Sequence, residues 1–217
     1  GEAARTRKII QTYKQTKGKS LLDVACGTGA HAGYLSRYYQ VEGLDLDAGL
    51  LAIAKKKLPK LRFHQGDMLD FDLGRQYDAI VCLFSSIGYV KTKSRLQKAI
   101  RTMARHLLPG GVLVIEPWFS AKQWHPGRAS MTQVNKPDLK IVRMSLSKQR
   151  GKLSLIEFQY LVGTSKGIEH SVEIHELGLF SHQEYLNAFK AAGLKVAHDP
   201  EGLDGRGLYI GQKELAA

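Results

Sequence analysis

The stretch that decides the fold is Leu22-Asp23-Val24-Ala25-Cys26-Gly27-Thr28-Gly29, a short apolar strand that ends in two glycines. Because Gly27 and Gly29 carry no Cβ, the backbone there can turn tightly and come close to a ligand. A helix is predicted directly after the turn, at residues 30–38, and its N-terminus would face that ligand. Strand, glycine turn and helix together predict an α/β fold with a ligand site at the end of the first strand.

Two kinds of ligand fit this glycine turn. Residues 27–32 satisfy the G-x-G-x-x-G/A fingerprint, in which the helix N-terminus holds the pyrophosphate of a dinucleotide such as NAD. Asp23, a carboxylate four residues before Gly27, favours instead a ligand that carries positive charge. The turn by itself leaves both possibilities open.

Short apolar strands alternate with helical segments on both sides of this stretch. This alternation is typical of a mainly parallel sheet covered by helices. Further strands are predicted at 41–44, 61–64, 79–84, 112–115, 194–197 and 207–213, and further helices at 48–58, 95–107 and 182–192. Asp47 and Ser181 are predicted to cap the helices that follow them.

The pattern changes after Pro117. Extended segments of mixed polarity at 140–147, 153–162 and 168–177 are separated by glycine-containing turns, which predicts an antiparallel sheet inserted into the α/β array. We therefore expect residues 1–117 and 179–217 to form the α/β domain and residues 118–178 to form the inserted sheet.

Composition and charge limit the possible functions. The 217 residues include 32 Lys and Arg against 20 Asp and Glu, a net charge of +12 that favours an anionic partner. Only Cys26 and Cys82 occur, so we expect no disulfide framework, no metal site and a reducing cytoplasm. We also expect no secretion leader and no membrane span, because the chain begins with charged residues and its apolar runs are short.

Two more aspartates follow predicted strands. Asp45 ends the second strand, where a carboxylate can accept hydrogen bonds from both hydroxyls of a ribose. Asp67 follows the third strand, next to Met68, and could accept from an adenine amino group while Met68 packs on the ring. Since ligands of open α/β sheets bind at the carboxyl ends of the strands, Asp23, Asp45 and Asp67 are predicted to share one site.

These residues resemble the first three cofactor motifs of the class I S-adenosylmethionine-dependent methyltransferases. The resemblance implies S-adenosylmethionine as the cofactor, with its amino-acid part at the glycine turn, its ribose at Asp45 and its adenine beside Asp67 and Met68. It also implies a Rossmann-like seven-stranded sheet with an antiparallel last strand. The residues assigned to the cofactor are Asp23, Ala25, Cys26, Gly27, Gly29, Asp45, Leu46, Asp67, Met68 and Leu83.

A closer resemblance covers most of the chain. Residues 84–89 (Phe-Ser-Ser-Ile-Gly-Tyr), 116–118 (Glu-Pro-Trp), 178–180 (Gly-Leu-Phe) and 205–208 (Gly-Arg-Gly-Leu) are similar to the N,N-dimethyltransferases that act on thymidine-diphosphate-linked amino sugars. This similarity implies N-methylation of a nucleotide-linked amino sugar. It also implies a homodimer in which the inserted sheet contributes to the substrate site and to the subunit contact.

The same resemblance assigns residues to the methyl acceptor. Tyr89 stands where this group places a Tyr or His near the sugar amine and is the catalytic candidate. Strand alternation puts Glu157 with Gln159 on one face of a strand, and Glu173 with His175 on one face of the next. The residues assigned to the acceptor, with arginines for the diphosphate and Trp118 for stacking, are Trp118, Arg143, Ser145, Ser147, Glu157, His175 and Arg206.

Other functions remain open from the sequence. The charge of +12 favours an RNA or protein methyltransferase, although residues 83–89 lack the Asn-Pro-Pro-Tyr motif common in enzymes that methylate nucleobase amino groups. An NAD-binding protein is the third alternative. The amino-sugar enzymes usually begin with a lid that contains Tyr-Asp pairs, whereas this chain starts in the helix that follows it, so lid contacts are not assigned.

Overall fold

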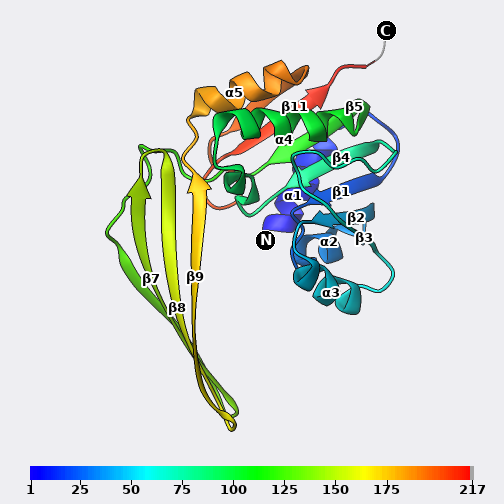
Figure 1. Ribbon diagram of the computed structural model, residues 1–217. Helices are drawn as coiled ribbons and strands as arrows, with labels where there is room; N and C mark the ends of the chain where they lie inside the picture. Colours follow the sequence, from blue (N-terminus) through cyan, green and yellow to red (C-terminus); the bar gives the residue numbers. More distant parts are fainter. Residues whose placement is uncertain (216–217) are drawn as a thin grey trace.

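The computed structural model describes residues 1–215, which form two separate sheets (Figure 1). The larger sheet has seven strands in the order β10-β11-β5-β4-β1-β2-β3, and only β11 runs antiparallel to its neighbours. The seven-stranded, mainly parallel sheet is therefore confirmed. Its strands are β1 (Ser20–Val24), β2 (Gln40–Asp45), β3 (Arg62–Gln65), β4 (Tyr77–Cys82), β5 (Leu107–Ile115), β10 (Leu194–Asp199) and β11 (Leu208–Lys213).

Helices cover both faces of this sheet. The helices are α1 (Glu2–Tyr13), α2 (Ala30–Leu35), α3 (Ala48–Lys57), α4 (Lys93–Arg105) and α5 (His182–Ala191), with a 3-10 helix, η1 (Ser86–Val90), after β4. One core lies beneath α4 and α5, where Leu96 and Tyr185 are buried against the sheet. The other lies beneath α1 and α2, around Ile10 and Ala32. Because alternate residues of each strand serve the two cores, the central strands are apolar on both faces.

Two helix starts follow the predicted capping chemistry. The Asp47 side chain accepts a hydrogen bond from the Leu50 N–H at 2.9 Å, at the start of α3. Ser181 and Glu184 form a reciprocal capping box at the start of α5. Both predicted caps are confirmed.

Four antiparallel strands form the inserted sheet, in the order β6-β7-β8-β9. They are β6 (Ala129–Lys136), β7 (Leu139–Arg150), β8 (Leu153–Thr164) and β9 (Gly167–Gly178). In Figure 1 this sheet extends away from the α/β body as a long arm, attached at one end only. The three predicted extended segments correspond to β7, β8 and β9, whereas β6 was not predicted.

The two ends of the inserted segment meet at Gly88 in η1. A Cβ at Gly88 would lie 2.9 Å from Leu177 Cδ2 and 3.1 Å from Trp118 Cβ, closer than side chains normally approach. Lys91, directly after η1, forms an ion pair with Glu176 of β9 at 2.9 Å. The arm is therefore fixed to the body where β4 leads into η1.

Several predicted boundaries were wrong, among them the end of the helix predicted for 95–107, which stops at Arg105 so that Leu107 belongs to β5. The helix predicted to end at residue 38 stops at Leu35. The strand predicted for 79–84 stops at Cys82, because Phe84 and Ser85 adopt φ of +52° and +59°, which no strand accommodates. β5 begins at Leu107, five residues earlier than predicted, and includes Gly111, where a Cβ would lie 2.8 Å from a backbone oxygen. No helix within residues 1–215 is long and apolar enough to cross a membrane.

Candidate functional site

Three residues of the glycine turn after β1 adopt the left-handed backbone conformation. Ala25, Gly27 and Gly29 have φ of +58°, +54° and +80°. A Cβ at Gly27 would meet nothing within 4 Å, so this glycine borders open space where a ligand can approach. At Gly29 a Cβ would lie 2.9 Å from Leu58 Cδ1, so that glycine allows α2 to start close to the end of α3.

The three aspartates predicted to share a site lie together at the carboxyl ends of β1, β2 and β3. The Gly27 N–H donates to Asp45 Oδ2 at 2.7 Å, and the Asp47 N–H donates to Asp45 Oδ1 at 2.9 Å. The Gly66 N–H donates to the Asp45 carbonyl oxygen at 2.9 Å, so the loop that carries Asp67 begins next to the end of β2. Asp45 thus links the glycine turn to the loop that follows β3.

Asp23 is a buried carboxylate with one unpaired oxygen. Its side chain is 2% exposed, and Oδ2 has no hydrogen-bond partner within the described residues. Burial, and then the charge of Asp45, raises the pKa of Asp23 to about 7. Because an unpaired buried carboxylate is unfavourable, this site suits a ligand with a positively charged group.

The residues predicted to hold an adenine ring differ in their exposure. Leu46 is 66% exposed beside Asp45, and half-buried Met68 packs against the core beneath α4. Leu83 is 3% exposed and packs in the other core, with Ile10 and Ala32. Leu46 and Met68 are therefore available at the surface, whereas Leu83 is buried, and contact of these residues with an adenine ring stays a prediction.

A strained turn follows β4. Phe84 and Ser85 both lie in the left-handed region, which side chains other than glycine rarely adopt. The Phe84 N–H donates to Glu116 Oε2 at 2.6 Å, and the Ser85 hydroxyl donates to the Pro117 carbonyl at 2.7 Å. Such strain is concentrated at functional sites, and here it leaves the Phe84 side chain 71% exposed.

Arg206 is held by two carboxylates. Its guanidinium is 15% exposed and forms ion pairs at 2.7 Å with Glu116 Oε1 and Asp204 Oδ2. Burial raises the pKa of Glu116, and Arg206 opposes that rise. The structure therefore places Arg206 behind the strained turn, with its charge already balanced, so contact with a diphosphate stays a prediction.

Tyr89 reaches from η1 to the inserted sheet. Its hydroxyl oxygen lies 2.5 Å from His175 Nδ1, and His175 Nε2 lies 3.3 Å from a carboxylate oxygen of Glu173. Tyr89 remains 44% exposed. Burial of the phenol, and then the charge of Glu173, raises the pKa of Tyr89. The structure thus brings together Tyr89 and His175, two residues that are 86 positions apart.

Strand register groups the side chains of the inserted sheet by face, and the contacts of His175 with Tyr89 and of Ser154 with Trp118 show which face is toward the body. We call inner face the side that carries Arg143, Ser145, Ser147, Ser154, Phe158, Tyr160, Glu173 and His175. Four of the predicted acceptor residues share it: Arg143, Ser145, Ser147 and His175. Ser145 hydrogen-bonds Ser130 on β6, and Ser147 accepts from the Arg128 N–H.

Arg143 supplies positive charge on the inner face. Its guanidinium lies over the Phe158 ring, 4.9 Å from the ring centre. Two other basic residues of β7, Lys148 and Arg150, are paired with Glu157 and Glu176. Within residues 1–215 no carboxylate forms an ion pair with Arg143, so its guanidinium is free to meet an anion.

Glu157 lies on the opposite side of the sheet. We call outer face the side that carries Met131, Met144, Leu146, Glu157, Leu161, Ile168, Val172 and Ile174. Glu157 Oε2 accepts a hydrogen bond from Lys148 Nζ at 2.9 Å, which together with a bond from Gln159 lowers its pKa. Glu157 is therefore not brought together with Tyr89 and the inner face.

Trp118 contributes to the attachment of the arm. Its Nε1–H donates to Ser154 Oγ on the inner face at 2.8 Å. Its ring packs against Phe119 and Trp124, with centroids 4.7 Å and 5.7 Å away. Because these contacts leave Trp118 only half-buried, a stacking role stays a prediction.

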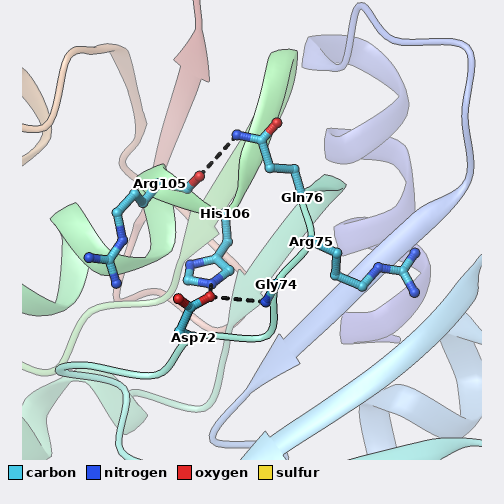
Figure 2. A pocket seen from close by; sticks show the side chains of 6 residues that line it. All are labelled: Asp72, Gly74, Arg75, Gln76, Arg105 and His106. Carbon is cyan, nitrogen blue, oxygen red and sulfur yellow. Dashed lines mark hydrogen bonds and ion pairs between the residues drawn. The ribbon is translucent and has the colours of Figure 1, made fainter.

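A hollow of about 290 Å³ lies at the other edge of the seven-stranded sheet (Figure 2). Asp72, Gly74, Arg75, Gln76, Arg105 and His106 line it. It lies beside Tyr77, where β4 begins, whereas the aspartates lie where the strands end. Its side chains are occupied with local hydrogen bonds, such as Gln76 to the Arg105 carbonyl, so it is not part of the candidate site.

Sequence reasoning missed three residues of this site. Glu116 directly follows β5, and a carboxylate at the carboxyl end of a parallel strand was the signal that could have identified it. Phe158 and Tyr160 gave no comparable signal, because only the strand register places them beside His175.

Comparison with known proteins gives a family for this geometry. A methyltransferase domain family matches residues 21–111. The dTDP-3-amino-3,6-dideoxy-alpha-D-glucopyranose N,N-dimethyltransferase of Streptomyces fradiae is 42% identical, over 97% of this chain and 83% of that protein. The match therefore includes the inserted sheet as well as the glycine turn.

Two solved structures have the same arrangement. The sugar N-methyltransferase KedS8 from a Streptoalloteichus species superimposes with a TM-score of 0.93 at 39% identity, over 98% of this chain and 87% of that one. The S-adenosylmethionine-bound amino pentose methyltransferase CalS10 from Micromonospora echinaspora superimposes with a TM-score of 0.89. The two chains are 37% identical over 98% of this chain and 90% of that one.

Proposed function

The chain belongs to the S-adenosylmethionine-dependent N-methyltransferases, in the family of the dTDP-amino-sugar N,N-dimethyltransferases, and from this premise we propose its methyl acceptor. That acceptor is the amino group of a sugar carried by thymidine diphosphate. The observation that carries the proposal is the extent of the similarity, because 97% of this chain matches a relative that acts on such a sugar. A shared cofactor domain alone would not identify an acceptor.

The residues around the glycine turn fit the cofactor. Asp23 offers an unpaired buried carboxylate oxygen to a cationic group, and Gly27 leaves open space beside it. Asp45 would hold the ribose hydroxyls, with Asp67, Leu46 and Met68 around the adenine. When bound, S-adenosylmethionine supplies a methyl group made electrophilic by the adjacent sulfonium.

The inner face of the inserted sheet suits the nucleotide part of the acceptor. Arg143 provides an unpaired guanidinium for a phosphate oxygen, and Ser145 and Ser147 provide hydroxyl groups on the same strand. Trp118, which donates to Ser154 of that face, and the exposed Phe84 ring after β4 offer apolar surface.

The protein's contribution to methyl transfer is alignment. Because the leaving group is good, the acceptor nitrogen needs chiefly to be neutral, to lie in line with the methyl carbon and to be shielded from water. Tyr89, which is 44% exposed and contacts His175 of the inner face, can orient the acceptor nitrogen by a hydrogen bond to its hydroxyl.

Turnover with a panel of acceptors tests the proposal. The protein is incubated with labelled S-adenosylmethionine and dTDP sugars that carry the amino group at different positions. Mono- and dimethylated products are expected from at least one sugar and none from the matching hydroxyl sugars. Methylated RNA or protein in parallel incubations, with no sugar product, would contradict it and favour the polymer methyltransferase that the charge of +12 suggests.

We propose further that two copies of this chain associate through the outer face. Seven large apolar side chains there are 37–78% exposed, namely Met131, Met144, Leu146, Leu161, Ile168, Val172 and Ile174. An exposed apolar patch of this kind marks an interface rather than a free surface. Sedimentation equilibrium should give the mass of a dimer, and a monomer at all concentrations would contradict the proposal.

We also propose a division of labour and a compartment. Residues 1–117 and 179–217 bind the cofactor, and residues 118–178 carry the acceptor and dimer contacts. The cytoplasm is the compartment that suits free Cys26 and Cys82.

A further inference from the structure

Three side chains form a row where η1 meets β9. Tyr89 Oη and His175 Nδ1 are 2.5 Å apart, and His175 Nε2 and the Glu173 carboxylate are 3.3 Å apart. An ionised carboxylate can only accept, so the ring nitrogen that faces Glu173 carries the hydrogen. The other ring nitrogen then accepts from the Tyr89 hydroxyl. The donors therefore point in one direction, from Tyr89 through His175 to Glu173.

We propose that His175 and Glu173 form a proton relay behind Tyr89, which removes the proton that an acceptor ammonium group must lose before it is methylated. The inference rests on the proposed function, because it requires an amine acceptor beside Tyr89. Tyr89 touches the acceptor and is the catalytic residue, whereas His175 and Glu173 act through it as positioning residues.

The step is balanced in atoms and charge. The ammonium gives one proton to Tyr89 Oη while the Tyr89 hydroxyl proton passes to His175 Nδ1. This leaves a neutral amine with a free electron pair, an unchanged phenol and an imidazolium that Glu173 stabilises. His175 releases the proton to solvent afterwards, since its side chain is 32% exposed. The arrangement parallels a hydroxyl, imidazole and carboxylate triad, with the tyrosine passing a proton instead of attacking.

Tyr89 cannot complete this step alone. Burial and the charge of Glu173 raise the pKa of its phenol above the ordinary value of about 10, so a free phenolate is scarce at neutral pH. Imidazole, with an ordinary pKa of about 6.5, accepts protons in the range where an enzyme works. The contact between Tyr89 and His175 gives the phenol an acceptor for its own proton.

The groups that face His175 come from three strands of the inserted sheet. Glu173 lies on the same strand, and the Tyr160 hydroxyl of β8 donates to Glu173 at 3.3 Å. The Phe158 ring meets the imidazole edge-on at 5.2 Å, and the Arg143 guanidinium of β7 lies over that same ring. Among the described groups the carboxylate is therefore in direct contact with the imidazole, whereas the cation is separated from it by Phe158.

The relay is not needed to attach the arm. Lys91 pairs with Glu176, and Leu177 packs against Gly88, at the same junction. A purely structural hydrogen bond between Tyr89 and His175 is the alternative explanation, and it predicts a different response to pH.

The pH dependence of kcat at saturating acceptor separates the two. In the wild type the proton moves within the complex, so the fraction of neutral amine, and with it kcat, should change little across neutral pH. In His175→Gln the proton must leave the complex, and kcat should fall about tenfold for each pH unit below an amine pKa of about 8. The deficit relative to wild type should grow from at most about twofold at pH 9 to about tenfold or more at pH 6.5.

Two further variants complete the test. Glu173→Gln should show a smaller deficit of the same form, because the imidazolium loses its carboxylate. Glu169→Gln, the same substitution on the same strand and face, should match the wild type at every pH. Normal rates at pH 9 show that each variant folds. A deficit of constant size at all pH values, or none, would overturn the relay.

A second measurement is independent of turnover. Nitrogen-15 spectra of the full chain should show His175 with its hydrogen on Nε2, and Tyr89→Phe should alter the signal of Nδ1. A hydrogen on Nδ1 overturns the relay. If the wild type methylates no amino sugar, the proposed function fails, and these spectra still decide whether His175 accepts from Tyr89.

Discussion

The two sheets of this protein differ in how their faces are covered and in how their candidate site residues are brought together. Both faces of the seven-stranded sheet are covered by helices, and its ligand residues follow strand ends that are recognisable in the sequence. The four-stranded sheet has one face toward the body and an outer face of exposed apolar side chains. The cofactor region is thus specified by local sequence, whereas the acceptor region depends on register between distant strands and, in our proposal, on a second chain.

The largest effect is expected on the cofactor side. Asp45→Ala removes the acceptor for two backbone N–H groups and the proposed partner of the ribose, so affinity for the demethylated cofactor should fall at least about 100-fold. Calorimetry measures it. Asp47→Ala, which removes only the cap of α3, is the control and should change affinity by less than about threefold. Equal affinities for wild type and Asp45→Ala would argue against the shared site.

Substitutions on the outer face should weaken dimer formation without lowering the stability of the folded chain. Ile174→Lys places a charge in the centre of the exposed apolar patch and should convert a dimer to a monomer in sedimentation experiments. The control is Lys148→Ile, which replaces a charged side chain of the same face with an apolar one and should not weaken association. A dimer that persists in Ile174→Lys would locate the interface elsewhere.

A pH-dependent loss of stability is expected in the seven-stranded sheet. Burial raises the pKa of Glu42, but hydrogen bonds from His64 and Tyr77 and the charge of Arg75 outweigh it, so the net shift is downward. A lowered folded-state pKa stabilises the fold above the unfolded value of about 4.3, and this contribution disappears as the pH falls through the folded value.

Glu42→Gln should therefore lower the free energy of unfolding by about 2 kcal/mol at pH 7, and the two curves should converge on acidification. Chemical denaturation between pH 3 and 7 checks this. Glu157 in the other sheet also has a lowered pKa, but its side chain is 32% exposed against 10% for Glu42. It is the matched control, and Glu157→Gln should have little effect. A constant difference at all pH values would mean that packing, not charge, stabilises Glu42.

The smallest effect on stability is expected from replacing one glycine in each sheet by alanine. A Cβ at Gly43 in β2 would lie 2.6 Å from the Phe63 ring, whereas a Cβ at Gly163 in β8 has its first neighbour at 3.7 Å. Gly43→Ala should lower the free energy of unfolding by at least about 1 kcal/mol, and Gly163→Ala should be near neutral. Thermal unfolding measures both, and similar losses would show that the two sheets are equally tightly packed.

The features that could be predicted from the sequence are the local ones of the seven-stranded sheet, whereas contacts between distant segments could not be predicted. Asp23, Asp45 and Asp67 were placed correctly at one edge because parallel strands end together, and the caps at Asp47 and Ser181 act over three residues. The contact of Tyr89 with His175 spans 86 positions, and that of Arg206 with Glu116 spans 90, so neither follows from spacing. Glu157 and His175 were equivalent candidates until the register assigned them to opposite faces.

The meeting of both ends of the inserted segment at Gly88 has an evolutionary consequence. A segment that leaves and re-enters the body at one point can be lengthened, shortened or replaced while the strands that hold the cofactor keep their connections. If residues 118–178 carry the acceptor contacts, as we propose, selection for a new methyl acceptor can act on them as an exchangeable segment. Grafting that segment between relatives at Trp118 and Leu177 is a rational route to enzymes with altered acceptors.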